Sequence, residues 1–318
     1  MKAAVLHQLG AKPKYDDFPA PAAEAGASVV RVAAAGVHHL VLARASGRFY
    51  TEVPAVPHVV GTDGVGFTDD GERVFFDETV GPHGTWAELT LVTTDRLMPV
   101  APGIDDVTAA ALGNTGLAAW TALTWRARLQ PGETVLVLGA AGALGRIAYQ
   151  AARALGAGAV VAADLPGPAL EELEAGSGVV TVPFAEDPDD FARRVADRAG
   201  PVDVIIDPLW GLPALGAIKA ARHGARLIQM GQVAALSLDL LATDLRARAM
   251  DLRGYALFHC PFDDRRSAYL DLTQSVADGT EKVDVEAVPL RDVKEAWERQ
   301  ARGARRKLVL VPEAPARV

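Results

Sequence analysis

A glycine-rich segment follows an apolar run in the middle of this chain and has the spacing of a phosphate-binding turn. Residues 134–139 predict a strand and residues 144–155 a helix, and between them runs the pattern A-x-G-x-x-G, with glycines at Gly142 and Gly145. The first glycine would let a pyrophosphate approach the backbone, and the second would let the helix pack closely on the strand. The helix N-terminus adds unpaired N–H groups and partial positive charge. The pattern predicts a dinucleotide site contacted by Ala140, Ala141, Gly142, Ala143, Leu144 and Gly145.

Asp164 ends the next apolar run, about 20 residues beyond the turn, the distance at which a carboxylate reaches the ribose hydroxyls of a dinucleotide. An anion there repels a 2′-phosphate, and no Arg or Lys occurs in residues 165–176, so the sequence favours NADH over NADPH. Arg193 or Arg194 could still reach the site from a neighbouring element. The alternative interpretation is a turn or helix-capping aspartate before Pro166.

Other residues follow later apolar runs, where open α/β sheets bind ligands at the carboxyl ends of their strands. Asp207 ends the predicted strand 202–207. Gly231, Gln232 and Val233 follow the next one, and their backbone groups are predicted to contact the nicotinamide ribose or amide. Cys260 has no base or motif around it that would make it a nucleophile, so a buried small hydrophobic residue is favoured.

The elements that carry these residues alternate between apolar strands and amphipathic helices. Strands too apolar to face water on either side, separated by helices, predict a parallel sheet covered on both faces. The result is a doubly wound Rossmann domain. The predicted strands are 134–139, 159–164, 179–182, 202–207, 225–230 and 251–255, and the predicted helices are 144–155, 168–175, 189–199, 212–221 and 238–249.

The flanking segments have a different pattern. Up to about residue 110, short β-rich runs are separated by Gly, Pro and Asp, which is typical of an antiparallel β domain. These runs are 2–7, 28–33, 58–67, 73–76 and 86–92. Beyond Leu270 we expect one more helix, a strand at 282–287, a helix at 290–300 and a final strand at 307–311. Because six strands already complete a Rossmann sheet, this tail is predicted to return to the first domain.

Composition excludes several classes of protein. The chain has 318 residues, of which 50% are hydrophobic and 23% are charged, so it is expected to be globular and to form two domains. A net charge of −8 argues against nucleic acid as the main partner. The five basic residues between Arg299 and Lys307 are interpreted as a solvated helix end. We expect no membrane span. The single cysteine and the absence of a secretory signal core predict a cytoplasmic protein.

The chain resembles the zinc-free quinone oxidoreductase group of the medium-chain dehydrogenase/reductase superfamily. The resemblance runs from Met1 to Pro312 in family order. Its segments are Val32-Ala33-Ala34-Ala35-Gly36-Val37, Arg44-Ala45-Ser46-Gly47 with Tyr50, Gly61-Thr62-Asp63-Gly64-Val65-Gly66, Gly71-Glu72-Arg73-Val74, Gly116-Leu117-Ala118-Ala119-Trp120 and 129–137. It implies a GroES-like substrate domain, residues 1–112 and 277–318, a Rossmann domain, residues 113–276, and commonly a homodimer.

The departures from zinc-dependent relatives bear on mechanism. Those relatives have a Cys where this chain has His38 and a His-Glu pair where it has Thr62-Asp63, and a structural cluster of four cysteines is absent. A catalytic zinc needs about three protein ligands. A metal held by histidines is the alternative, with His38, His39, His58 and His83 as candidates. Because His38 and His39 follow a strand and cannot easily both face one ion, no metal is expected.

The resemblance also assigns site residues. Tyr50 matches the active-site tyrosine of quinone oxidoreductases, and His38 occupies a polar pocket position. Asn114 and Thr115 match the segment that borders the nicotinamide, and Phe258 matches a stretch that lines the cleft. The alternatives are a Tyr50 packed under a loop, a His38 satisfied in the core, and an Asn114 that caps a helix.

These observations imply a zinc-independent NAD(P)H oxidoreductase that reduces a small molecule, either a quinone or an α,β-unsaturated carbonyl. Without a metal, acceptors that delocalise charge are favoured, because hydrogen-bond donors then suffice for the developing negative charge. Two alternatives stay open: a pathway-specific enoyl or carbonyl reductase, and a nucleotide-binding protein without turnover that acts as a structural or regulatory subunit.

Overall fold

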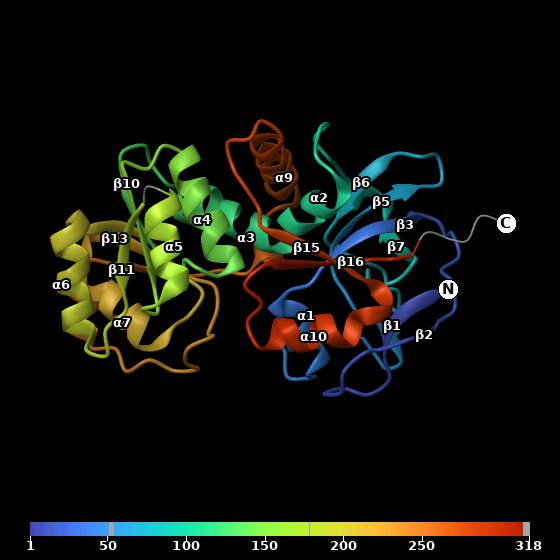
Figure 1. Ribbon diagram of the computed structural model, residues 1–318, viewed down its shortest axis with the longest axis horizontal. Coiled ribbons are helices and arrows are strands. Elements are labelled where there is room, and N and C mark those ends of the chain that lie inside the picture. The colour runs from blue at the N-terminus through green and yellow to red at the C-terminus, as the bar shows by residue number, and fades with distance from the viewer. Residues whose placement is uncertain (51–53, 178, 314–318) are drawn as a thin grey trace. The chain divides into compact units, whose positions relative to one another are not determined.

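The computed structural model describes residues 1–50, 54–177 and 179–313. The chain divides into two compact units (Figure 1). The first comprises Met1–Leu117 and Arg266–Val318, and the second comprises Ala118–Arg265. The dividing points lie inside two helices, α3 (Asn114–Thr121) and α9 (Phe262–Ala277), whereas the sequence suggested 112/113 and 276/277.

The second unit contains a six-stranded sheet whose neighbouring strands are all parallel, in the order β11-β10-β9-β12-β13-β14. Counted along this unit, the order is that of a Rossmann sheet, which confirms the predicted doubly wound fold. The direction of winding reverses between β9 and β12. The strands are β9 (Thr134–Leu138), β10 (Ala159–Asp164), β11 (Val180–Pro183), β12 (Val202–Asp207), β13 (Ala221–Gln229) and β14 (Asp251–Gly254).

Helices cover both faces of this sheet, so its central strands can be apolar throughout. All five residues of β9 are buried. Helix α4 packs on β9 and β10, while α6 and α7 pack on each other (Figure 1). The helical segments of this unit are η2 (Ala122–Ala127), α4 (Ala143–Ala154), α5 (Pro168–Ser177), α6 (Pro188–Ala199), α7 (Gly211–Lys219), α8 (Ala242–Arg246) and η3 (Leu257–His259).

The predicted helix at 238–249 is wrong for most of its length, because only α8 is helical. Leu238 and Leu240 pack against the core from a loop, so their apolar spacing reflects burial without helical geometry. The chain then leaves the helix through Ala249, which has a positive φ of 47°. The helix expected beyond Leu270 also differs: it is α9, which begins earlier, at Phe262, directly after Pro261.

The first unit contains two sheets in the described part of the chain. Strands β2-β1-β4 form one, and β15-β16-β3-β5-β6-β8 form the other, with β7 paired to β3. All pairs are antiparallel except β15 with β16. The strands are β1 (Lys2–Leu6), β2 (Lys14–Asp17), β3 (Ala27–Gly36), β4 (His58–Val59), β5 (Gly64–Thr68), β6 (Arg73–Phe76), β7 (Leu89–Thr93), β8 (Met98–Pro99), β15 (Val285–Pro289) and β16 (Lys307–Val311).

The C-terminal strands belong to this unit. Strand β16 pairs with β3, placing Leu310 opposite Ala35. Their side chains join one hydrophobic cluster that also holds Trp86 and Trp297. Alternating apolar residues of β3 and β16 therefore connect the two ends of the sequence through a common core. The helical segments are α1 (His39–Ala45), η1 (Thr94–Arg96), α2 (Asp106–Leu112), η4 (Leu290–Asp292) and α10 (Val293–Ala301).

The predicted strand at 58–67 is interrupted, and the interruption places polar residues. Gly61 has a φ of 102°, and a Cβ there would lie 2.4 Å from the Thr85 hydroxyl. The backbone therefore leaves extended geometry between β4 and β5. Thr62 and Asp63 lie in this break, next to the start of β5.

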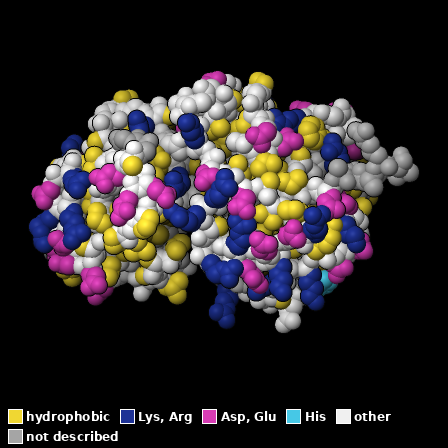
Figure 2. All heavy atoms as spheres, viewed as in Figure 1, with side chains coloured by type: hydrophobic (Ala, Val, Ile, Leu, Met, Phe, Trp, Pro, Cys, Tyr) yellow, Lys and Arg dark blue, Asp and Glu magenta, His cyan; other side chains and the backbone are white. Residues whose placement is uncertain are grey.

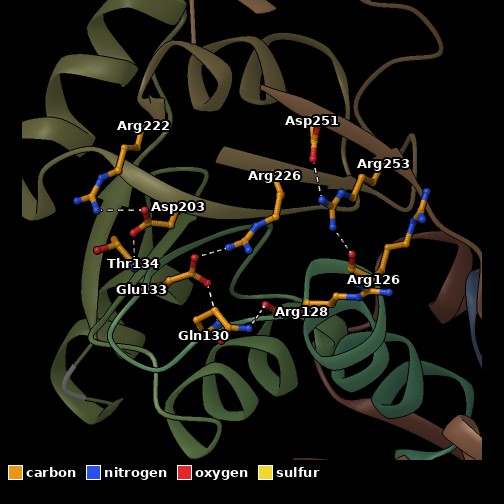
Figure 3. A network of polar contacts seen from close by, with 10 residues as sticks. All are labelled: Arg126, Arg128, Gln130, Glu133, Thr134, Asp203, Arg222, Arg226, Asp251 and Arg253. Atoms are coloured by element: carbon orange, nitrogen blue, oxygen red, sulfur yellow. Dashed lines mark hydrogen bonds and ion pairs between the residues drawn. The ribbon is translucent and has the colours of Figure 1, made fainter. Parts of the chain in front are cut away.

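A polar network joins the amino-terminal ends of the parallel strands (Figure 3). Glu133 accepts a hydrogen bond from Arg226 at 2.6 Å, and Asp203 accepts one from the backbone N–H of Thr134 at 2.9 Å. Arg222 also forms an ion pair with Asp203, at 3.1 Å. These contacts lie at the sheet edge opposite the carboxyl ends of the strands, so we interpret them as fixing the scaffold that holds the glycine turn.

Charges of both signs are interspersed on the face drawn in Figure 2. In the basic run near the C-terminus, Arg299 pairs with Glu286 at 2.6 Å and Arg306 pairs with Asp284 at 2.6 Å. The interpretation of this run as a solvated helix end is wrong for Lys307, which begins β16 and is 4% exposed. Helix α10 ends at Ala301, so Lys307 lies beyond the helix that the sequence extended towards it.

Within the described residues, no helix combines the length and apolar character that a membrane crossing requires.

Candidate active site

The glycine turn connects β9 to α4. Gly139 leaves the strand with a positive φ of 68°, and Gly142 is the N-cap of the helix without a side-chain cap. A Cβ on Gly145 would lie 2.3 Å from the carbonyl oxygen of Gly139. Only a glycine therefore permits this close packing of the helix against the end of the strand.

The turn has the features of a phosphate cradle. A Cβ on Gly142 would meet a single neighbour within 4 Å, the Gly139 carbonyl oxygen at 3.3 Å, so the outer side of this residue is open. The N–H groups of Ala143, Leu144 and Gly145 belong to the first helical turn and have no carbonyl acceptor within the helix. An anion at this point would meet unpaired donors and the positive end of the helix dipole.

Asp164 lies at the carboxyl end of β10 and is bonded to the turn. Its Oδ2 accepts a hydrogen bond from the N–H of Ala141 at 2.8 Å, and its Oδ1 accepts one from Leu165 at 2.7 Å. The structure thus gives Asp164 the turn-bracing contacts of the alternative interpretation. An ionised carboxylate offers about four acceptor sites, so these two bonds leave capacity for ribose hydroxyls.

Arg146 also reaches this turn, and sequence reasoning did not single it out. It follows Gly145 in α4, is half-buried, and donates from Nε to the carbonyl oxygen of Ala141 at 2.9 Å. Ala141 therefore bonds Asp164 through its N–H and Arg146 through its carbonyl. The available signal was a basic residue in the first turns of the helix that follows the glycine pattern. Arg193 and Arg194, the candidates from the sequence, pair instead with Asp190 on α6.

Asp207 is fully buried at the carboxyl end of β12. Its Oδ1 accepts hydrogen bonds from the backbone N–H groups of Leu209 at 2.9 Å and Trp210 at 2.8 Å, while Oδ2 has no partner among the described residues. Burial raises the pKa of Asp207 to about 6 against the lowering effect of those bonds. The carboxyl group thus braces the turn before α7 and keeps one buried oxygen unsatisfied.

Gly231, Gln232 and Val233 follow β13 at the same edge of the sheet. A Cβ on Gly231 would lie 2.4 Å from the carbonyl oxygen of Pro208, so glycine is required there. The Gly231 carbonyl already accepts a hydrogen bond from Gln229 at 2.6 Å. Gln232 and Val233 are exposed. The N–H of Val233 donates to the Pro208 carbonyl oxygen at 3.4 Å, and the cofactor contacts of this segment stay a prediction.

Phe258 and Cys260 follow the last strand of this unit, β14. Phe258 lies in η3 and is 37% exposed, with its ring 4.6 Å from that of His259. Cys260 is 2% exposed, which confirms its interpretation as a buried residue.

In the first unit, His38 and Asp63 form a buried pair. The two residues are 5% and 1% exposed, and His38 Nε2 lies 2.6 Å from Asp63 Oδ1. The hydroxyl of Thr62 is within 3.3 Å of both atoms. Because a carboxylate only accepts hydrogen bonds, Nε2 carries the proton and donates it. His38 Nδ1 is buried and has no partner among the described residues.

Lys307 joins the same buried network. Its Nζ donates to the carbonyl oxygen of Val37 at 2.7 Å and to the hydroxyl of Thr115 at 2.9 Å. Asp63 Oδ2 accepts a hydrogen bond from the N–H of Asn114 at 2.9 Å. The structure thus brings together three predicted residues, His38, Asn114 and Thr115, through two that sequence reasoning did not assign to the site, Asp63 and Lys307.

The charges of this network stabilise one another. Burial alone would raise the pKa of Asp63, but His38, Lys307 and the Asn114 N–H together hold it below its usual value. Burial lowers the pKa of Lys307 to about 8, although the Asp63 carboxylate opposes this shift. Asp63 is therefore an anion near neutral pH. It orients the His38 ring and leaves Nδ1 as the atom that can hold or give a proton.

Tyr50 lies at the end of a described segment, directly before residues 51–53, which the structure does not describe. It is 73% exposed, and its ring lies 4.3 Å from that of Phe49. The alternative in which Tyr50 packs under a loop does not fit this exposure.

The four candidate histidines do not form a metal centre. His58 Nδ1 lies 3.2 Å from the carbonyl oxygen of Ala55, and the ring of His83 packs edge-on to Phe18. His39 is exposed, whereas His38 is buried. Over residues 1–50, 54–177 and 179–313, no group of three His, Cys, Asp or Glu side chains has the arrangement to hold a metal ion.

The second unit is a parallel sheet with a glycine turn, and the first unit is mainly antiparallel. No family model matches the chain. It is 30% identical to the quinone oxidoreductase of Rattus norvegicus over 254 residues, which are 76% of this chain and 75% of that protein. It is also 30% identical to the Mus musculus quinone oxidoreductase over 226 residues, covering 68% and 67%.

A solved structure of similar fold is the quinone oxidoreductase of Thermus thermophilus, which is also known in complex with NADPH. It aligns with a TM-score of 0.82 and 29% identity, over 98% of this chain and all of that one. The chain belongs to the quinone oxidoreductase group of the medium-chain dehydrogenase/reductase superfamily. This places it among the oxidoreductases of that superfamily, with a Rossmann unit and a GroES-like unit.

Proposed function

We propose that this protein is an NAD(P)H-dependent oxidoreductase that transfers hydride to a quinone or an α,β-unsaturated carbonyl without zinc. The observation that carries the proposal is the turn from Gly139 to Gly145, with its open side at Gly142 and Asp164 beside it. The similarity to quinone oxidoreductases, one of them known with NADPH, supports the same cofactor class.

The residues of the second unit fit a dinucleotide. The first-turn N–H groups of α4 would hold the pyrophosphate, and the Asp164 carboxylate would accept hydrogen bonds from the ribose. Backbone groups of residues 231–233 and the ring of Phe258 are proposed to position the nicotinamide. The bound cofactor would supply the hydride, and the protein would supply orientation and electrostatics.

The residues of the first unit are proposed to serve the acceptor. As hydride arrives, negative charge develops on the acceptor oxygen, and a positioned donor lowers the barrier. The Tyr50 hydroxyl is the proposed donor. His38, held through Nε2 by Asp63, is the proposed second group, and its Nδ1, which has no partner among the described residues, would serve the acceptor. Asn114 and Thr115 are proposed to border the nicotinamide.

The proposed mechanism needs no metal. Thr62 and Asp63 stand where zinc-dependent relatives have His and Glu, and His38 Nε2 is engaged by Asp63. We expect purified protein to contain less than stoichiometric zinc by elemental analysis and to keep its activity in a strong chelator, because one or two histidines cannot hold a catalytic ion tightly. Stoichiometric zinc whose removal abolishes turnover would contradict the metal-free mechanism.

Asp164 is proposed to favour NADH. Its carboxylate would accept hydrogen bonds from the ribose hydroxyls and repel a 2′-phosphate, and charge-assisted bonds of about 1.5 to 3 kcal/mol suffice for a preference of about tenfold. Asp164→Ser should therefore lower the ratio of the NADPH to the NADH dissociation constant by about that factor. Titration of both cofactors by fluorescence measures the ratio. A ratio that does not change would leave Asp164 only its turn-bracing bonds.

Two other functions give different results in one experiment. Purified protein is mixed with NADH or NADPH and a panel of small quinones and enones, and cofactor oxidation is followed. Turnover with quinones or simple enones supports the proposal, whereas turnover only with a larger enoyl or carbonyl substrate indicates a pathway-specific reductase. Binding of the cofactor without oxidation under any condition would indicate a structural or regulatory subunit.

A homodimer and a cytoplasmic location remain part of the proposal. The homodimer follows from the resemblance, and the cytoplasmic location from the single cysteine.

A further inference from the structure

Arg146 presents a guanidinium group at the nucleotide turn that is only partly used by the protein. Its Nε donates to the Ala141 carbonyl, which fixes the plane of the group. Its two terminal nitrogens, Nη1 and Nη2, have no hydrogen-bond or ion-pair partner among the described residues. The side chain therefore holds one edge of its donor fork against the turn and leaves the other donors for a ligand.

The neighbouring charges do not neutralise this group. Asp164 meets the same residue, Ala141, but both of its oxygens accept backbone N–H groups and it forms no ion pair with Arg146. The first turn of α4 contains no acidic side chain. Arg193 and Arg194 of α6, the basic candidates from the sequence, are paired with Asp190.

The guanidinium of Arg146 could meet either of two phosphates of a dinucleotide, the pyrophosphate or a phosphate on the ribose. The pyrophosphate of a dinucleotide is served by the N–H groups of the helix N-terminus, which begins at Ala143. The ribose end is marked by Asp164, because the acidic residue at the end of the second strand is the one that meets the ribose hydroxyls. Arg146 and Asp164 both bond Ala141, one through its carbonyl oxygen and the other through its N–H, so the two side chains share this residue of the turn.

We propose that Arg146 binds the 2′-phosphate of NADPH and thereby opposes Asp164 in setting the cofactor preference. This inference rests on the proposed dinucleotide site and deepens it. A guanidinium matches the oxygens of a phosphate with two parallel hydrogen bonds, which an ammonium or a backbone N–H cannot do. Asp164 then favours the ribose hydroxyls of NADH, Arg146 favours the extra phosphate, and the protein accepts both cofactors.

Adenosine fragments test this assignment without turnover. Dissociation constants for 2′,5′-ADP and for 5′-AMP are measured by calorimetry on the wild type, on Arg146→Gln and on Arg153→Gln. Arg153 lies in the last turn of the same helix and serves as the matched control. We expect Arg146→Gln to weaken 2′,5′-ADP by about tenfold or more while 5′-AMP changes by less than about twofold, because charge-assisted bonds to a phosphate are strong. Arg153→Gln should change neither constant.

The remaining outcomes overturn the inference. An equal loss for both fragments would assign the guanidinium to the 5′-phosphate, and no loss for either would leave Arg146 as a brace of the turn. If the wild type binds NADH and 5′-AMP and the Arg146→Gln variant binds 2′,5′-ADP as tightly as the wild type does, this inference alone is refuted. A wild type that binds no adenine nucleotide at all refutes the proposed function together with it.

Discussion

Asp63→Asn is expected to destabilise the protein by about 3 to 5 kcal/mol, the cost typical of removing one partner from a buried charged pair. Asparagine keeps the shape of the side chain and removes its charge. His38 and Lys307 then remain in the core without the anion that stabilises both. The free energy of unfolding, measured by chemical denaturation at neutral pH, is the quantity to compare.

The expected penalty depends on pH. Burial lowers the pKa of Lys307 to about 8, and the Asp63 charge raises it. Without Asp63 this pKa falls further, so in the variant Lys307 loses its proton at a lower pH. A lysine whose pKa is lower when folded than when unfolded gains stability as pH rises. The variant gains this stability at a lower pH than the wild type does. The difference between their free energies of unfolding should therefore shrink between pH 7 and pH 9.

Asp17→Asn is the matched control for this experiment. Asp17 pairs with Lys2 on the surface, with 76% of its side chain exposed, and surface pairs contribute little. We expect no measurable change in its free energy of unfolding. An Asp63→Asn variant as stable as the wild type, or a penalty that does not vary with pH, would mean that the buried charges do not depend on Asp63.

Tyr50→Phe is expected to leave the dissociation constant of the cofactor unchanged and to lower turnover with an enone about a hundredfold. Phenylalanine keeps the ring and its contact with Phe49 but removes the hydroxyl. The loss therefore isolates the stabilisation of charge on the acceptor oxygen, for which one donor contributes about 2.7 to 4 kcal/mol. Quinones should be affected less, because their reduced product already delocalises charge.

Tyr15→Phe gives a matched loss of a tyrosine hydroxyl in the same unit, on strand β2. It should change neither turnover nor cofactor affinity. If Tyr50→Phe turns over both acceptor types at the wild-type rate, Tyr50 has no part in the chemistry. His38 or a bound water would then be the remaining donor.

Local patterns in the sequence predicted the Rossmann unit well. The apolar run ending in Asp164 and the glycine spacing at Gly142 and Gly145 are set by neighbours in the chain, so each could be interpreted alone. The prediction of a helix at 238–249 also relied on a local pattern, and it was wrong. Its apolar spacing includes Leu238 and Leu240, which pack against the core from a loop and are partly buried, and periodicity alone does not distinguish this from an amphipathic helix.

The buried network of the first unit was beyond such reasoning. Lys307 is separated from Val37 by most of the chain, and the strand pairing of β16 with β3 brings them together. In the sequence Lys307 ends a run of basic residues, which favoured a solvated position. Arg146 was missed for a different reason: its contact with Ala141 depends on the direction of one side chain, which the glycine pattern does not specify.

The central claim is that this protein delivers hydride from a nicotinamide to an electron-poor acceptor, and isotope transfer tests it most directly. The enzyme is incubated with a simple enone and NADH carrying deuterium at the transferable C4 position, in parallel with the other C4 epimer. The account predicts that one epimer places one deuterium on the β-carbon of the saturated product for each cofactor oxidised. Two results together would contradict it in a protein that binds NADH and NADPH. The enone would yield no deuterated product with either epimer, and the quinone panel would fail to oxidise the cofactor.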